Sequence, residues 1–242
     1  MDYSKEKIQE NLRMLHEKIA SAEKKAGRQS GSVKVQAVSK FHPASSVFNA
    51  IEAGQLVFGE NRVQEAVQKF DEITAAGKKV ELHLIGTLQR NKVKNAVRIA
   101  SCIESVDRIE LLKEIEKQCA NFNKKITVFF EFHTGEESKS GFLTAEELAE
   151  AIQYCADGNT PHIIPRGFMT MAPLTDDKKR IHSSFALMSE TALKMREKYP
   201  QFDLTELSMG MSGDFEIAVE EGSTQVRIGT AIFGERDYSI LK

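Results

Sequence analysis

Residues 125–132 read KITVFFEF, and this stretch decides the fold because it is the clearest β-strand in the chain. Thr144 begins a helix after it, with Glu147 three residues on, which is the spacing of a capping box. A strand followed by a helix in this way is one unit of an alternating β/α chain.

The same unit recurs on both sides of this stretch. Short apolar runs predict seven further strands, at residues 33–38, 56–58, 80–85, 102–106, 163–168, 204–208 and 225–229. Helical spacing predicts the segments between them, at 44–53, 61–76, 88–100, 177–198 and 214–221, with Asp107 as the N-cap of another. Glycines at 27, 54 and 77 are expected to end helices.

Alternating units imply parallel strands, in either a closed barrel or a doubly wound sheet. Eight units within 242 residues favour the closed (β/α)8 barrel. We expect one barrel domain over residues 1–242, with an extra N-terminal helix at about 3–26.

Composition excludes several classes of protein. The chain has 33 basic and 35 acidic residues, a net charge of −2, so no basic excess indicates nucleic acid. It has neither an apolar signal sequence nor a run of the roughly 20 apolar residues that cross a bilayer. Three scattered cysteines, Cys102, Cys119 and Cys155, favour buried, reduced thiols and a cytoplasmic location.

Active sites of such barrels lie at the carboxyl ends of the strands. Lys40 follows the first strand, where an apolar wall lowers the pKa of an amine and lets it attack an aldehyde. A solvated surface lysine is the simpler interpretation of that position taken alone.

Two glycine-containing loops follow the last two strands, where barrels commonly bind phosphate. Residues 208–214 read SMGMSGD, and residues 226–230 read VRIGT, in which Gly229 permits close approach of an anion and Thr230 offers a hydroxyl. Two tight turns that need glycine are the alternative. Both loops together favour phosphate.

Other residues are expected near the mouth. Residues 58–61 (FGEN) and 167–173 (GFMTMAP) follow strands, and His83 lies within one, where a satisfied core histidine is more common than a catalyst. The polar loop at 135–142 is expected to act as a lid, and Lys139 within it is a candidate second aldehyde site.

Taken together, these motifs resemble the pyridoxal phosphate homeostasis protein family over nearly the whole chain. The matching stretches are 38–40 (VSK), 58–61 (FGEN), 83–86 (HLIG), 135–142 (GEESKSGF), 167–173 (GFMTMAP), 207–215 (LSMGMSGDF) and 226–230 (VRIGT). The resemblance implies the fold-type III barrel, which is similar to the N-terminal domain of alanine racemase. It also implies bound pyridoxal 5′-phosphate (PLP), a form of vitamin B6.

The resemblance assigns roles residue by residue. Lys40 would form the imine (Schiff base), and Arg227 would face the pyridine nitrogen. The phosphate would be held by Ser212, Gly229 and Thr230, with Asn61 and Met209 near the cofactor. The chain departs from the family pattern at Thr87, at residues 41–42 and at residues 129–133, all expected at the edge of the pocket.

Three functions remain open at this point. The first is a PLP carrier or buffer without turnover, because an arginine opposes ring protonation and the barrel leaves no residues for a second, acid/base-supplying domain. The second is a fold-type III enzyme such as an amino-acid racemase, and the third is a lysine-dependent aldolase. Apo PLP-dependent enzymes are candidate partners of a carrier, which would be a monomer or a weak dimer.

Overall fold

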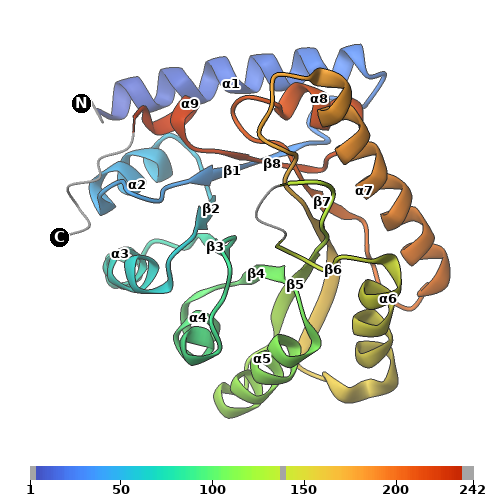
Figure 1. Ribbon diagram of the computed structural model, residues 1–242. Coiled ribbons are helices and arrows are strands. Elements are labelled where there is room, and N and C mark those ends of the chain that lie inside the picture. Colours follow the sequence, from blue (N-terminus) through green and yellow to red (C-terminus); the bar gives the residue numbers. More distant parts are fainter. Residues whose placement is uncertain (1–3, 137–139, 236–242) are drawn as a thin grey trace.

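The computed structural model describes residues 4–136 and 140–235, which form a closed barrel of eight parallel strands surrounded by helices (Figure 1). The strands follow one another in chain order, and β8 closes the ring against β1, where Val226 lies opposite Val35. The predicted closed barrel is therefore confirmed, and the doubly wound sheet is wrong.

The strands are β1 (Lys34–Val38), β2 (Val57–Glu60), β3 (Glu81–Leu84), β4 (Cys102–Val106), β5 (Ile126–Glu131), β6 (Ile163–Met169), β7 (Glu206–Ser208) and β8 (Gln225–Ile228). The α-helices are α1 (Lys5–Lys25), α2 (Ala44–Glu52), α3 (Val63–Ala75), α4 (Val93–Ile99), α5 (Ile109–Phe122), α6 (Ala145–Tyr154), α7 (Lys178–Lys198), α8 (Phe215–Glu220) and α9 (Thr230–Phe233). A 3₁₀ turn, η1 (Arg90–Lys92), precedes α4, and a π-turn, η2 (Cys155–Asn159), follows α6.

Helix α1 precedes the barrel and packs against α2, α8 and α9 (Figure 1). Its inward residues repeat every three or four positions, and all are buried: Ile8, Leu12, Leu15, Ile19 and Ala22. The Ser4 hydroxyl accepts the first-turn amide of Lys7 at 3.3 Å. Gly27 follows the last turn with a φ of +68°, the left-handed conformation expected of a glycine that ends a helix.

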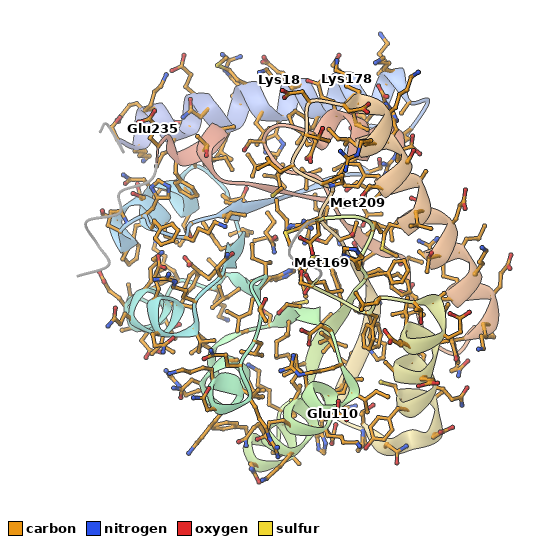
Figure 2. All side chains as sticks on the ribbon, in the orientation of Figure 1. Lys18, Glu110, Met169, Lys178, Met209 and Glu235 are labelled. Atoms are coloured by element: carbon orange, nitrogen blue, oxygen red, sulfur yellow. The ribbon has the colours of Figure 1, made fainter. Side chains whose placement is uncertain are left out.

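The apolar core is divided by the barrel wall. A large cluster fills the space between strands and helices, and a small one, made of Cys102, Phe129 and Met169, lies within the barrel. Figure 2 shows Met169 and Met209 near the middle of the molecule, whereas Lys18 and Glu110 lie on helices at its periphery; Met169 belongs to the small inner cluster and Met209 to the large one. All three cysteines are buried free thiols, as predicted.

Polar side chains also cross the barrel interior. Glu104 on β4 accepts a hydrogen bond from Gln36 of β1 at 2.7 Å and another from Gln225 of β8 at 2.8 Å. All three residues are fully or almost fully buried. Both amide groups donate to the same oxygen of Glu104, whereas Gln36 Oε1 and the second oxygen of Glu104 are buried without a hydrogen-bond partner among the described residues.

Several predicted boundaries are wrong by a few residues. The second strand was expected at 56–58 but extends to Glu60, because Lys69 and Ser39 hydrogen-bond the Glu60 carboxyl and make its burial possible. The seventh strand was expected from residue 204 but begins at Glu206. The segment 88–100 is divided into η1 and α4 rather than forming one helix.

The helix caps give mixed results. Thr144 caps α6, accepting the amide of Glu147 at 3.2 Å, and Glu147 accepts the amide of Leu143 at 2.9 Å. Asp107 does not cap α5; the N-cap residue is Arg108, with which the Asp107 carboxylate pairs. None of the described helices combines the length and apolar character that a membrane span requires.

Gly167 permits close contact between β6 and β7. A β-carbon there would lie 1.9 Å from the carbonyl oxygen of Glu206, the residue opposite in register. We expect Gly167→Ala to lower the free energy of unfolding by about 3 kcal/mol, since the strands would have to separate.

Unfolding in urea measures this loss of free energy. Gly213→Ala is the control, because no atom lies within 4 Å of its added β-carbon, and equal losses in both variants would contradict the explanation.

Candidate functional site

A cavity of about 320 Å³ opens at the carboxyl ends of the strands. Most strands or the loops that follow them contribute to its wall, as expected for the functional face of a barrel. The lining residues are Val38, Lys40, His42, Asn61, Ile85, Gly86, Thr87, Glu131, Ser140, Met171, Met211, Ser212, Gly213, Arg227, Gly229 and Thr230. Below we call this cavity the mouth pocket.

Six of the seven predicted site residues line the mouth pocket: Lys40, Asn61, Ser212, Arg227, Gly229 and Thr230. Met209 does not line it, because its side chain is fully buried in the apolar core. Met211, two residues later, lines the pocket instead. The predicted residues thus come together from the ends of four strands, β1, β2, β7 and β8, as the barrel geometry requires.

The backbone on both sides of Lys40 is firmly held. The Ser39 amide donates to the carbonyl oxygen of Gly59 at 3.1 Å, and the Ser39 carbonyl oxygen accepts the Lys69 ammonium at 2.7 Å. The Phe41 amide donates to the Glu65 carboxylate at 2.6 Å, and Phe41 has a φ of +64°. A non-glycine residue in this left-handed region is strained, and such strain is concentrated at functional sites. The turn after β1 therefore places Lys40 at a defined point of the pocket wall.

A buried charge cluster supports this turn. The Lys69 ammonium lies 2.6 Å from the Glu60 carboxyl and 3.1 Å from that of Glu65, and the Ser39 hydroxyl donates to Glu60 at 2.7 Å. Burial raises the pKa of Glu60 to about 7, against the lowering effect of Lys69. The cluster joins β2 and α3 to the peptide groups that flank Lys40.

The loop after β7 turns sharply at the edge of the pocket. Gly210 has a φ of +95°, and a β-carbon there would lie 2.5 Å from that of Ala218. The Asp214 carboxyl accepts the Met211 amide at 2.5 Å, which holds Ser212 and Gly213 at the pocket wall. Gly229 lies on the other side, close to β1, where a β-carbon would be 3.2 Å from the Val38 carbonyl oxygen. Small residues and a hydroxyl on both sides make this part of the pocket suited to an anion.

Arg227 places a positive charge in the wall of the pocket, and its side chain is only 5% exposed. Its guanidinium donates to the carbonyl oxygen of Ser208 at 2.6 Å, to the Ser208 hydroxyl at 2.9 Å and to the carbonyl oxygen of Thr170 at 2.7 Å. Burial lowers the pKa of Arg227, while the nearby acidic side chains oppose that lowering. The hydrogen bonds to Thr170, directly after β6, and to Ser208 of β7 fix the direction of the guanidinium.

Glu131 is a pocket residue that the sequence analysis missed. It ends β5, lines the mouth pocket and is nearly buried, and the Ser140 hydroxyl donates to its carboxyl at 2.5 Å. Burial raises its pKa to about 7, although Ser140 and Arg227 act to lower it. A single acidic residue inside the apolar run 125–132 was the signal available in the sequence.

The loop expected to act as a lid contributes Ser140 to the pocket. It returns to β5 through the Phe142 amide, which donates to the Glu131 carbonyl oxygen at 2.8 Å. Lys139 lies outside the described residues. His83 is directed into the barrel interior, where its ring lies 2.6 Å from the Glu104 carboxylate, and it does not line the mouth pocket.

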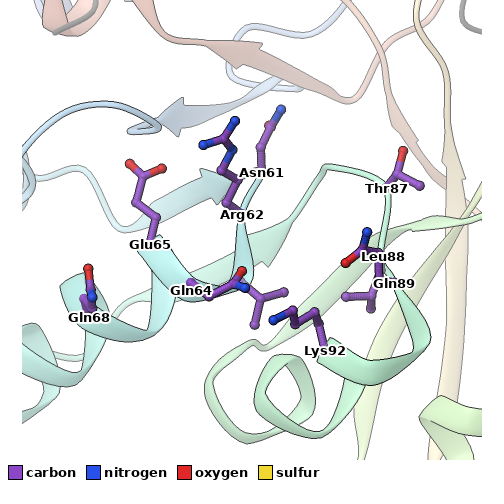
Figure 3. Close-up of a pocket in the computed structure, with 10 residues that line it drawn as sticks. Asn61, Arg62, Gln64, Glu65, Gln68, Thr87, Leu88, Gln89 and Lys92 are labelled. Carbon is purple, nitrogen blue, oxygen red and sulfur yellow. The ribbon is translucent and has the colours of Figure 1, made fainter. Parts of the chain in front are cut away.

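A second cavity of about 720 Å³ adjoins the mouth pocket and shares Asn61 and Thr87 with it. Its walls come from the start of α3 on one side and from residues 87–92 on the other (Figure 3). Most of its lining residues carry polar or charged groups, among them Arg62, Gln64 and Lys92. Asn61 therefore lies on the boundary between the two spaces.

The fold and the site together define a (β/α)8 barrel of the alanine racemase N-terminal type, with a lysine and two loops of small residues at its mouth. The family model for the N-terminal domain of alanine racemase matches residues 4–237. Proteins named pyridoxal phosphate homeostasis protein are 37% identical in Pasteurella multocida (235 residues, 96% of this chain and 99% of the relative) and 37% identical in Escherichia coli K12 (238 residues, 96% and 98%). The chain belongs to the pyridoxal phosphate homeostasis protein family.

Solved structures agree with this placement. PipY of Synechococcus elongatus PCC7942, solved with PLP bound, superposes with a TM-score of 0.82 at 33% identity, covering 94% of this chain and 100% of PipY. Alanine racemase from Bacillus anthracis shares the fold, with a TM-score of 0.71 at 17% identity over 98% of this chain and 58% of the racemase.

Proposed function

We propose that this chain binds PLP in the mouth pocket, through an imine with Lys40, and that it serves the homeostasis of PLP as a carrier or buffer. The observation that carries this proposal is the convergence of Lys40, Arg227 and the two small-residue loops on one pocket. A protein with the same fold and 33% identity has been solved with PLP bound. A 320 Å³ pocket with a few convergent polar groups also suits a ligand of this size.

The residues divide into three roles. Lys40 would hold the aldehyde carbon, and Arg227 would lie against the pyridine nitrogen. Ser212, Gly229 and Thr230 would bind the phosphate. Asn61 would contact the cofactor at the boundary with the second cavity, and Met209 would support the site from the core.

Arg227 is a reason for proposing a carrier rather than an enzyme of the transaminase type. PLP supplies catalysis when a protonated pyridine ring withdraws electrons from the substrate. A guanidinium has no proton that it can practically give up, so it opposes ring protonation. Three hydrogen bonds to Ser208 and Thr170 keep Arg227 from turning away.

A fold-type III enzyme such as an amino-acid racemase is the second candidate, and Glu131 is the observation that favours it. A carboxyl with a pKa near 7 in the pocket wall can exchange protons at neutral pH. The discriminating experiment incubates the PLP-loaded protein with amino acids in deuterated water. A carrier gives no α-proton exchange above that of free PLP. Exchange that is lost in Glu131→Gln would establish the enzyme instead.

PLP binding itself is tested by the visible absorption spectrum of the purified protein after addition of PLP. We expect a yellow protein, and after borohydride reduction we expect the label on the peptide that contains Lys40. A protein that stays colourless with added PLP would overturn the proposal. That result would instead favour a lysine-dependent aldolase acting on sugar phosphates, because such an enzyme has no visible chromophore.

The carrier role further implies partners and a location. We place the protein in the cytoplasm, as a monomer or a weak dimer, delivering PLP to apo PLP-dependent enzymes. Its net charge of −2 fits neither nucleic acid nor a membrane surface. The PLP-loaded chain should restore activity to an apo-enzyme, and recovery no faster than with an equal amount of free PLP would contradict delivery.

A further inference from the structure

A cluster of three chemically reactive side chains lies at the opposite, amino-terminal end of the barrel. His83 on β3 is directly opposite Cys102 on β4, and Glu104 follows Cys102 by two residues, so that all three side chains share the inner face. A cavity of about 180 Å³ at this end is lined by His83 and Cys102. No role in the mouth pocket uses these residues.

The three side chains are close enough to share one ion. One ligand atom from each of His83, Cys102 and Glu104 lies within 4.8 Å of the other two, and all three residues are buried. Ligands bound to one tetrahedral zinc ion lie about 3–4 Å apart, so small side-chain adjustments suffice. Within the described residues this is the one group of histidine, cysteine and acidic side chains that meets this spacing.

The surrounding groups hold Glu104 in place. Gln36 and Gln225 donate to the same carboxylate oxygen that lies 2.6 Å from His83 Nδ1. Outer hydrogen bonds of this kind orient the ligands of metal sites and increase their affinity. The Glu104 carboxylate therefore already faces the imidazole of His83, with which it would share the ion.

The charge at this end of the barrel favours a cation. Glu81 stands at the rim with its carboxylate 3.8 Å from His83 Nε2, in addition to the buried Glu104. The two basic residues of the cavity wall are already paired, Lys34 with Glu206 at 2.7 Å and Arg166 with Asp203 at 2.6 Å. His83 lies between Glu104 and Glu81 and balances these two carboxylates, so a divalent cation that displaces its proton would take over that charge.

We propose that His83, Cys102 and Glu104 bind a divalent ion of the zinc class, with a fourth position open to the cavity. The combination of imidazole, thiolate and carboxylate suits zinc better than magnesium or calcium, which prefer oxygen alone. On binding, the proton shared by His83 and Glu104 and the thiol proton of Cys102 both pass to solvent, as the ion forms bonds to the imidazole, the carboxylate and the sulfur. The ion ties β3 to β4, far from the mouth pocket.

The test is a titration of the tag-free, full-length protein with Co²⁺, followed by displacement with Zn²⁺. We expect one Co²⁺ per chain, with the strong absorption of a thiolate bound to cobalt. Cys102→Ser should lose that absorption, and His83→Gln should weaken the affinity at least tenfold. Cys155→Ser is the matched control, because Cys155 is also a buried free thiol, and it should bind as the unmodified protein does.

Two further measurements do not depend on the folding of the variants. Zn²⁺ should raise the unfolding temperature of the unmodified protein. It should also slow alkylation of Cys102, but not of Cys119 or Cys155, in partly denaturing urea. Each of three results would refute the site. The unmodified protein could lack cobalt–thiolate absorption, or Cys102→Ser could keep it. Zn²⁺ could also leave the alkylation rate of Cys102 unchanged.

Discussion

Lys40→Ala is expected to eliminate covalent binding of PLP and to leave the purified protein colourless. The amine of Lys40 is the group proposed to form the imine, and alanine offers no nucleophile at that position. The variant should keep its fold, because Lys40 is only half-buried and the adjoining turn is held through the backbone of Ser39 and Phe41. Weak, noncovalent binding of PLP should persist, since the proposed phosphate residues are unchanged.

The measurement compares absorption spectra and borohydride-stable label in the unmodified protein and in the variant. Lys92→Ala is the matched control, because Lys92 lines the neighbouring cavity but not the mouth pocket. It should keep the colour and the label. If Lys40→Ala retained a full equivalent of label, the imine would form on another lysine and the assignment of Lys40 would be wrong.

The barrel could be predicted because its determinants are local. The apolar runs of the strands and the 3.6-residue repeat of helices such as α1 are visible in any window of the sequence. Errors occurred where tertiary contacts decide the outcome. Glu60 could be assigned to a strand only with knowledge that Lys69, on the next helix, neutralises its carboxyl.

The site was predictable in part for a similar reason. Loops that follow strands must lie at the mouth of a barrel, so Lys40 and the loops around Ser212 and Gly229 could be located from strand order alone. The direction of a single side chain could not. Met209 and Met211 differ by two residues, yet one is buried in the core and the other lines the pocket. Glu131 was missed because it belongs to a strand rather than to a loop.

The second large effect is expected from Lys69→Met, which removes the cation from the cluster behind Lys40. Lys69 is 6% exposed, and its ammonium contacts the carboxyl groups of Glu60 and Glu65 and the carbonyl oxygen of Ser39. Removal of one partner from a buried ion pair leaves charge without compensation and costs about 3–5 kcal/mol. We expect a loss of that size in the free energy of unfolding at neutral pH, measured with urea.

The loss should depend on pH because Glu60 can take up a proton. Its pKa in the folded protein, about 7, is raised above the ordinary value of 4.5. The contribution of Glu60 to stability is therefore fully present below about pH 4.5 and is lost as the pH rises through about 7. Lys69 lowers this pKa, so the variant should hold the proton to higher pH. The difference in stability between the two proteins should then be larger at pH 8 than at pH 5.

Two companion variants separate this explanation from a general loss of packing. Lys69→Met combined with Glu60→Gln should regain part of the stability, because the second change removes one of the unpaired carboxyl groups. Lys18→Met, at an exposed position of α1, should change stability by no more than about 0.5 kcal/mol. A difference independent of pH, with no recovery in the double variant, would mean that Lys69 contributes through its packing alone. Lys69 also donates to the carbonyl oxygen of Ser39, next to Lys40, so Lys69→Met should form less imine with PLP. Glu60→Gln does not restore that hydrogen bond. The double variant should therefore regain less of its imine formation than of its stability.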